Sequence, residues 1–148
     1  MTTAKTFYIA LGSNKGDKFK NLQDAIDLIH ARIGIIIRIS KVYKSPAFGF
    51  ESDDFLNACL VVESDLQAQK VLEQLLVIEV ELGRVRSKKS TYEARTIDLD
   101  IVFVQEDIID TDTLQVPHPE MQKRKFVLLP LNDVAPTVKH PILKKEVS

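Results

Sequence analysis

Hydrophobic residues follow two different periods along the chain, and the changes of period predict where strands and helices alternate. Residues 7–11, FYIAL, are typical of a strand that ends at the turn residues 12–14. Over residues 18–33 the large apolar residues recur every three or four positions, which is the spacing of one helical face. Gly34 is placed to end this helix. The apolar positions of the face are Leu22, Ile26, Ile29 and Ile33.

Two further strands are predicted after this helix. Residues 35–43, IIIRISKVY, are rich in β-branched side chains, and residues 55–63, FLNACLVVE, form a second apolar run. A polar loop that contains proline and glycine separates them. Side chains alternate between the two faces of a strand, so Asn57 and Cys59 are expected on the face opposite to Leu60.

A second helix is predicted between Ser64 and Leu82, with Gly83 as its end. The sequence S-D-L-Q matches a capping box, in which Ser64 would pair with Gln67. Glu79 lies on the apolar face, where a carboxylate is either paired with a nearby arginine or part of a ligand site. The sequence leaves both readings open. The apolar residues of this face are Ala68, Val71, Leu72, Leu75, Ile78 and Leu82.

The remaining pattern completes one domain that spans residues 1–148. A fourth strand is predicted over residues 97–104, followed by a minor turn-and-strand region, a short helix over 120–129 and an irregular tail. The order β-α-β-β-α-β is the ferredoxin-like arrangement. It belongs to the α+β class, with an antiparallel sheet and both helices on one face, here followed by a C-terminal extension.

Composition excludes several classes of protein. The 148 residues are 45% hydrophobic and 28% charged, and no apolar run approaches the roughly 20 residues of a membrane helix. The N-terminus lacks the pattern of a signal peptide, so we expect a cytoplasmic protein that does not contact a membrane. Cys59 is the only cysteine, so an internal disulfide is excluded and a buried, unreactive thiol is expected.

Charge is balanced over the whole chain but not locally. The net charge of −1 argues against nucleic acid as a partner. From Arg84 to Arg95, however, five basic residues and one acidic residue give a local net charge of +4. This basic segment stands immediately before two aspartates.

The two aspartates, Asp98 and Asp100, are expected on one face of the fourth strand with Cα atoms about 6.6 Å apart. A solvated polar face is the simplest explanation of such a D-x-D pattern. Val102 and Val104 are expected to continue on the same face, which would place the carboxylates at the mouth of a concavity. Two unpaired carboxylates about 4 Å apart would repel each other by about 4 kcal/mol at an effective dielectric constant near 20. Mg²⁺ is the natural counter-charge, because it prefers oxygen ligands and commonly binds together with a phosphate.

The arginines extend this hypothesis from a metal to a nucleotide. An acidic pair can bind a metal ion, and the forked guanidinium donors beside it can bind the phosphates that the metal carries. The ligand that fits this combination best is a Mg-nucleotide. The chain has no G-x-x-x-x-G-K-[ST] loop and no H-R-D or D-F-G element, which excludes P-loop enzymes and protein kinases.

Aromatic and amide side chains indicate a second substrate. Phe55 and Asn57 share one strand face, and Phe126 lies two residues beyond Arg124. Two rings could hold a flat heterocycle while the amide reads its edge, although ordinary core packing explains isolated phenylalanines equally well. His118, between two prolines, could contact phosphate or stabilise its own loop.

Several motifs in this order resemble one known family. The stretches GSN, FLNA, IEVELGRVR, ARTIDLDIVF, PHP and RKFVLLPL are similar to those of the hydroxymethyldihydropterin pyrophosphokinases of folate biosynthesis, over residues 7 to about 141. The resemblance implies transfer of pyrophosphate from ATP to the hydroxymethyl group of 6-hydroxymethyl-7,8-dihydropterin, with release of AMP. It also implies two Mg²⁺ ions on Asp98 and Asp100. We expect a monomer whose partners are these small molecules.

The same resemblance implies roles for individual residues. Arg84, Arg95, Asp98 and Asp100 would be catalytic. The residues expected to meet ATP are Leu72, Glu79, Arg84, Arg86, Arg95, Ile101, His118 and Arg124. The residues expected to hold the pterin are Ser45, Pro46, Phe48, Phe55, Asn57 and Phe126.

Some positions depart from the family pattern, and two other functions fit the same fold. Tyr92, Ala94 and Ser45 stand where tryptophan, proline and threonine are usual. The loss of the proline at Ala94 should make the loop from Arg86 to Arg95 more mobile. One alternative is a domain that binds a nucleotide without consuming it. Another is an RNA-binding domain, which the aspartates on the fourth strand and the missing R/K-G-F-G-F pattern disfavour.

Overall fold

The computed structural model describes most of the first 116 residues and two positions beyond them. The described residues are 4–45, 55–83, 97–105, 108–112, 114–116, Pro130 and Asp133. The helices are α1 (Lys18–Arg32) and α2 (Ala68–Glu81). The strands are β1 (Lys5–Ser13), β2 (Ile35–Ile39), β3 (Tyr43–Ser45), β4 (Phe55–Ser64), β5 (Asp98–Val104), β6 (Ile109–Asp110) and β7 (Gln115–Val116).

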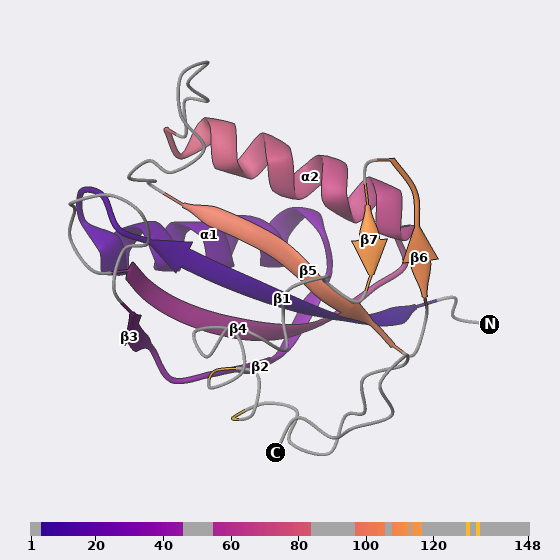
Figure 1. The fold of residues 1–148 in the computed structure, drawn as a ribbon, viewed down its shortest axis with the longest axis horizontal. Helices are drawn as coiled ribbons and strands as arrows, with labels where there is room; N and C mark the ends of the chain where they lie inside the picture. Colours follow the sequence, from indigo (N-terminus) through magenta and orange to yellow (C-terminus); the bar gives the residue numbers. More distant parts are fainter. Residues whose placement is uncertain are drawn as a thin grey trace.

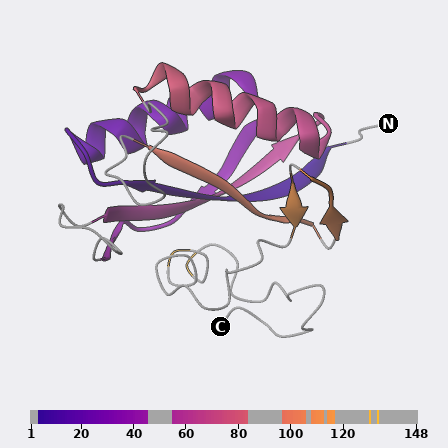
Figure 2. The same ribbon diagram turned by 45° about the horizontal axis from the view of Figure 1, so that its top comes forward.

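The main sheet is antiparallel and has the strand order β2-β4-β1-β5, with β3 also paired to β4. Both helices pack on one face of this sheet (Figures 1 and 2). The predicted ferredoxin-like α+β arrangement is therefore confirmed. Of the expected C-terminal extension only Pro130 and Asp133 are described, and the short helix expected over 120–129 lies outside the described residues.

The hydrophobic core lies between the helices and the sheet. The sheet contributes alternate residues such as Phe7, Ile9 and Leu60, and α1 contributes Leu22 and Ile29. Each of these side chains is almost fully buried, which confirms the predicted helical and strand faces. On α2 the buried residues are Val71, Leu75, Ile78 and Glu79.

The glycines that follow the two helices have different roles. Gly83 has a φ of 101° and donates its N–H to the Val80 carbonyl, so it ends α2 in a left-handed conformation, as a glycine commonly does. Gly34 is not among the residues with positive φ. A Cβ there would instead collide with the backbone of β4, at the Glu63 carbonyl and 3.0 Å from Ser64 Cα. The prediction of a helix end at Gly34 is correct, but the reason is a close backbone approach.

The predicted capping box at Ser64 is wrong. Ser64 is the last residue of β4. The N-cap of α2 is Gln67, three positions after Ser64, and its side chain makes no capping hydrogen bond. The Ser64 hydroxyl donates to the Ile33 carbonyl at 2.6 Å and accepts from Leu66 N at 3.1 Å. A long-range contact with the end of α1 therefore takes the hydroxyl that a capping box would use.

The single strand predicted over residues 35–43 is divided into β2 and β3. Ser40 lies at the interruption, where its N–H donates to the Cys59 carbonyl at 2.9 Å and its hydroxyl accepts from Cys59 N at 2.8 Å. The side-chain oxygen thus replaces a backbone acceptor and bends the chain, and a register shift between Ile36 and Arg38 adds to the irregularity.

A β-bulge changes the face of the last residues of β5. The β1–β5 register pairs Ala10 with Asp100 and Ile9 with Ile101, then shifts, so that Tyr8 pairs with Phe103. The residue between, Val102, is the extra one. The expectation that Val104 continues the face of the aspartates is therefore wrong, because one additional residue reverses the alternation beyond the bulge.

Phe103 takes that place on the face of the aspartates. Its ring packs edge-on against Tyr8, with the ring centroids 5.9 Å apart. Val104 joins the core on the helix side.

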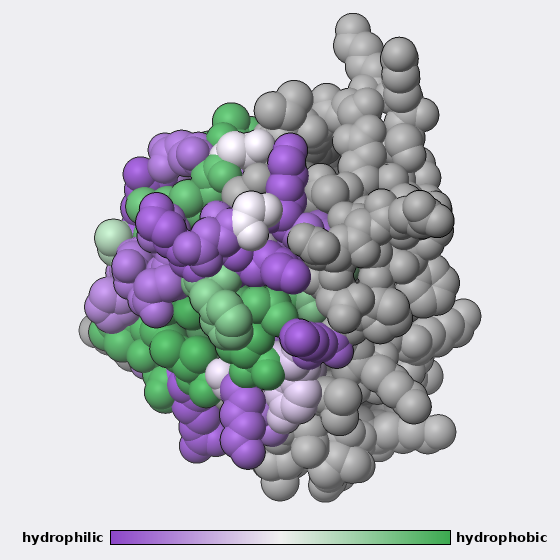
Figure 3. Space-filling view, turned by 90° about the vertical axis from the view of Figure 1, so that its left-hand side faces the viewer, coloured by the Kyte–Doolittle hydropathy of each residue, from purple (hydrophilic) through white to green (hydrophobic). Residues whose placement is uncertain are grey.

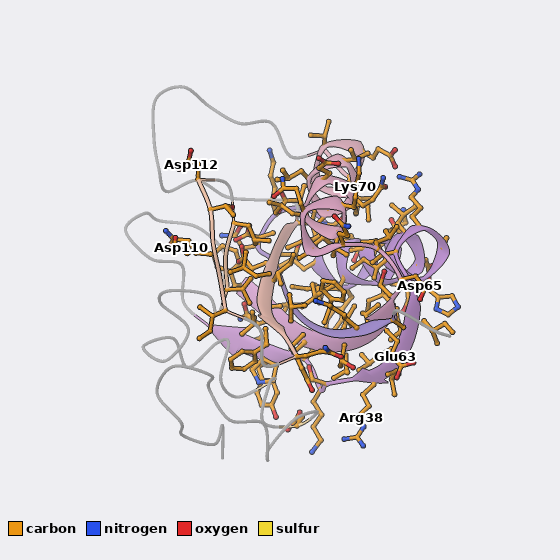
Figure 4. The ribbon with its side chains drawn as sticks, turned by 90° about the vertical axis from the view of Figure 1, so that its right-hand side faces the viewer. Arg38, Glu63, Asp65, Lys70, Asp110 and Asp112 are labelled. Carbon is orange, nitrogen blue, oxygen red and sulfur yellow. The ribbon has the colours of Figure 1, made fainter. Side chains whose placement is uncertain are left out.

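Part of the surface is apolar. Seen from the side on which β1 ends and β5 begins, hydrophobic groups gather between hydrophilic ones (Figure 3). On the edge strand β2, Ile35, Ile37 and Ile39 are all exposed. Arg38 interrupts this run with a charge and projects away from the sheet (Figure 4), a common protection against edge-to-edge pairing.

The predicted minor region after β5 is confirmed as a short hairpin of β6 and β7. Within the described part of the chain, neither helix combines the length and the apolar character that crossing a membrane requires.

Candidate functional site

The sheet face opposite to the helices brings together the acidic pair and Asn57, the residue expected to hydrogen-bond to the edge of a heterocycle. The strand register pairs Gly12 with Asn57 on one side and with Asp98 on the other. Directly paired residues point to the same face, so Asn57, Gly12 and Asp98 form one row across β4, β1 and β5. With strands about 4.8 Å apart, the outer members of the row are roughly 10 Å from each other.

A second row lies beside the first and has the same character. Ala10 pairs with Cys59 on β4 and with Asp100 on β5. The central strand therefore contributes only a hydrogen and a methyl group between the larger side chains of its neighbours. We call Gly12 and Ala10 the site floor. Such small residues in a strand are typical of places where another group approaches the backbone closely.

The site floor was not identified from the sequence. The sequence pattern predicts a turn at Gly12 after the first strand, whereas β1 continues through Ser13. The position of Gly12 between Asn57 and Asp98 depends on two inter-strand registers, and neither is visible in a local sequence pattern. The one local sign is that Gly12 directly follows an apolar run, because a glycine in a strand often marks a close approach.

The acidic pair is half-buried and lies on one face, as predicted. Asp98 and Asp100 each stand opposite a residue of the site floor. Among the described residues, no group of three His, Cys, Asp or Glu side chains is arranged to hold a metal ion. Two carboxylates nevertheless fit Mg²⁺, because this ion commonly takes one or two protein carboxylates and completes its shell with water and substrate phosphates.

Asn57 and Phe55 border the other side of the site floor. Asn57 is buried and its amide donates to the Tyr43 carbonyl at 3.4 Å, so the side chain is oriented by β3. A Cβ added at Gly12 would lie 3.3 Å from Asn57 Oδ1 and 3.4 Å from Phe55 Cδ1. The amide and the ring thus both contact the space above Gly12, and the expectation that they share one face is confirmed.

Tyr43 is itself held by a residue far away in the sequence. Its hydroxyl donates to the Asp133 carboxylate, at 2.8 Å from Oδ1 and 2.7 Å from Oδ2, and Lys41 N donates to the same carboxylate at 3.1 Å. The hydrogen bond to Asp133 raises the pKa of the Tyr43 phenol. Asp133 therefore contacts the strand that orients Asn57.

Glu79 makes a contact that neither interpretation of the sequence included. Its side chain is 2% exposed, and Oε2 accepts a hydrogen bond from Leu99 N at 2.8 Å. Leu99 is the residue between the two aspartates of β5. The two arginines near it in the sequence, Arg84 and Arg86, lie outside the described residues.

The two apolar residues expected near ATP lie on the helix side of the sheet. Leu72 is half-buried on α2 and packs against the core. Ile101 pairs with Ile9 and is 4% exposed, which leaves little of its side chain to meet a ligand.

Many of the expected site residues are not described. Ser45 belongs to β3, but its side chain is not among those described. The others outside the described residues are Pro46, Phe48, Arg84, Arg86, Arg95, His118, Arg124 and Phe126. Their roles stay predictions.

The cysteine on this face is buried and unreactive in character. Cys59 is 0% exposed, and burial raises the pKa of its thiol to about 12. The thiolate that nucleophilic chemistry requires is therefore nearly absent near neutral pH. The expectation of a buried, inert thiol is confirmed.

Comparisons with known proteins agree on one family. The model of the family described as 7,8-dihydro-6-hydroxymethylpterin-pyrophosphokinase (HPPK) matches residues 8–136. The chain is 39% identical over 137 residues to a Porphyromonas gingivalis protein named 2-amino-4-hydroxy-6-hydroxymethyldihydropteridine pyrophosphokinase, covering 90% of this chain and 92% of that protein. A protein of the same name from Aquifex aeolicus is 38% identical over 141 residues, covering 95% and 86%.

Solved structures agree at the level of the fold. A Plasmodium falciparum HPPK-DHPS structure superposes with a TM-score of 0.79 at 15% identity and covers 99% of this chain. The match spans 44% of the Plasmodium chain.

Proposed function

The chain belongs to the 7,8-dihydro-6-hydroxymethylpterin-pyrophosphokinase family, and on this premise we propose how its residues carry out the reaction. The protein is a pyrophosphokinase of folate biosynthesis. Its substrates would be ATP and 6-hydroxymethyl-7,8-dihydropterin, and its products AMP and the pyrophosphorylated pterin. The observation that carries the residue assignment is the row of Asn57, Gly12 and Asp98 across the sheet.

This row separates two chemically different halves of the site. The amide of Asn57 would read the edge of the pterin on one side, while Asp98 and Asp100 would hold two Mg²⁺ ions on the other. When bound, the metal ions would neutralise phosphate charge and bridge the nucleotide to the protein. The separation of roughly 10 Å leaves room between them for the hydroxymethyl group and the phosphate that it attacks.

The remaining residues would bind the two substrates. Phe55 and Phe126 would hold the faces of the pterin, with Ser45, Pro46 and Phe48 closing on it. The basic residues would bind the polyphosphate, because guanidinium groups match phosphate oxygens. These residues are Arg84, Arg86, Arg95, His118 and Arg124. Leu72 and Ile101 would lie toward adenine, with Ile101 offering its backbone. We further propose that the protein acts as a cytoplasmic monomer.

The chemistry of the reaction consists mainly of positioning and charge neutralisation. The hydroxyl oxygen of the pterin forms a bond to the β-phosphorus of ATP and loses its proton. The bond from the β-phosphorus to the oxygen that bridges it to the α-phosphate breaks, and AMP leaves with that oxygen. Holding the hydroxyl group and the β-phosphorus in line supplies much of the acceleration.

The identity of the nucleotide product tests the proposal. We expect AMP to accumulate in proportion to pterin consumed when the protein is mixed with ATP, Mg²⁺ and 6-hydroxymethyl-7,8-dihydropterin. Separation of nucleotides by ion-exchange chromatography measures this directly. Formation of ADP, or hydrolysis of ATP without the pterin, would reject the reaction. ATP binding without consumption would instead indicate a nucleotide-binding domain without catalysis, a function that the names of the relatives do not favour.

Substitution of Gly12 should impair pterin binding more than ATP binding. In Gly12→Ala the new methyl group would press against Asn57 Oδ1 and the ring of Phe55, at 3.3 and 3.4 Å. We expect the KM for the pterin to rise roughly tenfold, equivalent to about 1.4 kcal/mol, with a much smaller change in the KM for ATP. Steady-state kinetics with each substrate varied in turn measures the difference.

Gly16→Ala is the matched control for this experiment. Gly16 lies in the turn before α1, and a Cβ there would meet only Asn21 Nδ2 at 3.9 Å. Equal changes in the two KM values of Gly12→Ala would contradict its placement on the pterin side.

A further inference from the structure

The described part of the chain contains one charged side chain among its buried residues, Glu79. It lies on α2 with Val71, Leu75 and Ile78, all of which are 0% exposed. A carboxylate among apolar side chains is unfavourable unless hydrogen bonds compensate for lost hydration. An apolar residue would fill the same space without that cost, so the carboxylate calls for a reason other than packing.

The hydrogen bond of Glu79 supplies this reason. Oε2 accepts from Leu99 N at 2.8 Å, a distance typical of a strong bond to a charged acceptor. β5 is the last strand in the order β2-β4-β1-β5, so a backbone N–H on its outer side has no strand partner within this sheet. The carboxylate satisfies this N–H from the neighbouring helix.

The bond acts on the peptide unit that joins the acidic pair. The Leu99 amide is one planar unit with the carbonyl of Asp98, and its orientation sets the backbone angles on either side. Asp98 directly precedes this unit, and Asp100 directly follows Leu99. A fixed Leu99 amide therefore constrains the directions of the Cα–Cβ bonds that carry the two carboxylates above the site floor.

The same bond joins the two elements that flank the basic segment in the sequence. Glu79 lies in the last turns of α2, and Leu99 lies at the beginning of β5. Arg84, Arg86 and Arg95 fall between them in the sequence. One hydrogen bond thus joins the helix that precedes this segment to the acidic strand that follows it.

We propose that Glu79 is a positioning residue, which holds the Leu99 amide so that Asp98 and Asp100 together present a metal site. The proposal rests on the assignment of the acidic pair to metal made above. It gives Glu79 a role through the backbone of β5, whereas the family resemblance predicts a contact with ATP.

Three variants separate these roles. Glu79→Leu fills the buried space but removes the acceptor, Glu79→Gln keeps an oxygen that can accept from Leu99 N, and Glu73→Leu is a control at an exposed position of the same helix. The probe is Mn²⁺, titrated into each protein with a non-hydrolysable ATP analogue and followed by electron paramagnetic resonance. Binding of the analogue alone is measured in EDTA, and circular dichroism verifies that each variant is folded.

We expect Glu79→Leu to weaken Mn²⁺ binding about tenfold or more, as the loss of a residue that orients metal ligands commonly does. The Mg²⁺ concentration for half-maximal turnover should rise by a similar factor. Glu79→Gln and Glu73→Leu should remain within about twofold of the wild type in Mn²⁺ affinity. Binding of the analogue in EDTA should not change in any variant.

Other outcomes overturn the proposal in distinguishable ways. A folded Glu79→Leu protein with wild-type Mn²⁺ affinity would remove the positioning role. Weaker binding of the analogue in EDTA would show direct nucleotide contact instead. If Glu79→Leu does not fold, the test rests on Glu79→Gln. A loss of Mn²⁺ affinity in Glu79→Gln as large as that in Asp98→Ala would show that the charge of Glu79 acts on the metal, rather than its hydrogen bond to the Leu99 amide. Wild-type Mn²⁺ affinity in Asp98→Ala would reject the metal assignment itself.

Discussion

Replacement of either aspartate of the acidic pair should almost abolish pyrophosphoryl transfer while the protein stays folded. In Asp98→Ala and Asp100→Ala the metal would lose a ligand, and the phosphate charge would be left without its counter-charge. Interactions of a bound metal with a transferring phosphoryl group supply several kcal/mol, so we expect kcat/KM to fall by about a hundredfold or more. The AMP-release assay measures this loss.

Folding should change little in these variants, because both side chains are half-buried and like charges on neighbouring positions repel each other. We expect the melting temperature to stay within about 3 °C of the wild type. Asp110→Ala is a suitable control, because Asp110 is an exposed residue of β6 (Figure 4), and β6 lies at the opposite end of the sheet from the start of β5 (Figure 1). Substantial activity in both acidic-pair variants would show that the metal is held elsewhere.

Gly34→Ala should cause the largest loss of stability among single methyl additions to the described glycines. The new Cβ would collide with the Glu63 carbonyl and lie 2.9 Å from the Glu63 carbonyl carbon and 3.0 Å from Ser64 Cα. These atoms belong to the backbone of β4, which cannot move aside as a flexible side chain can. We expect a loss of about 3 kcal/mol in the free energy of unfolding, or about 6–12 °C in melting temperature for a chain of this size.

Gly16→Ala separates steric conflict from backbone conformation. Gly16 has a φ of 70°, which disfavours alanine, but a Cβ there would meet only Asn21 Nδ2 at 3.9 Å. This variant should lose about 1 kcal/mol. Thermal and urea unfolding of both proteins give the comparison. A melting temperature of Gly34→Ala equal to or above that of Gly16→Ala would contradict a rigid contact between the start of β2 and the end of β4.

The order of the elements could be predicted from the sequence because it depends on local periodicity. The helical face that includes Leu22 and Ile29 and the alternation around Leu60 each need only a short window of residues. The same holds for the shared face of Asn57 and Cys59. Together these patterns indicated a ferredoxin-like sheet before any pairing of strands was known.

Errors arose where a distant contact decides the local structure. Ser64 matches a helix cap in sequence, but the Ile33 carbonyl, 31 positions away, takes its hydroxyl. The bulge at Val102 reverses the side-chain alternation of β5 because β1 pairs on both sides of it. No local pattern distinguishes these cases from a regular cap or strand.

The candidate site was predicted in part, and the reason is chemical. Carboxylates, an amide and a cluster of arginines can be recognised as groups that bind metal, heterocycle and phosphate wherever they occur. Gly12 and Glu79 could not be assigned in this way. Gly12 matters for the side chain that it lacks, and Glu79 matters for the backbone group that it contacts, so both depend on the folded arrangement.

The site floor belongs to β1, which is flanked by strands on both sides. Central strands generally open only when the whole domain unfolds, whereas loops and edges open locally at a lower free energy. Exposure of Gly12 and Ala10 to solvent by fluctuation should therefore be rare. Substitutions at the ends of β3 and β4 should therefore change substrate preference more readily than substitutions in the site floor. A larger side chain in the site floor would disturb both substrate recognition and folding.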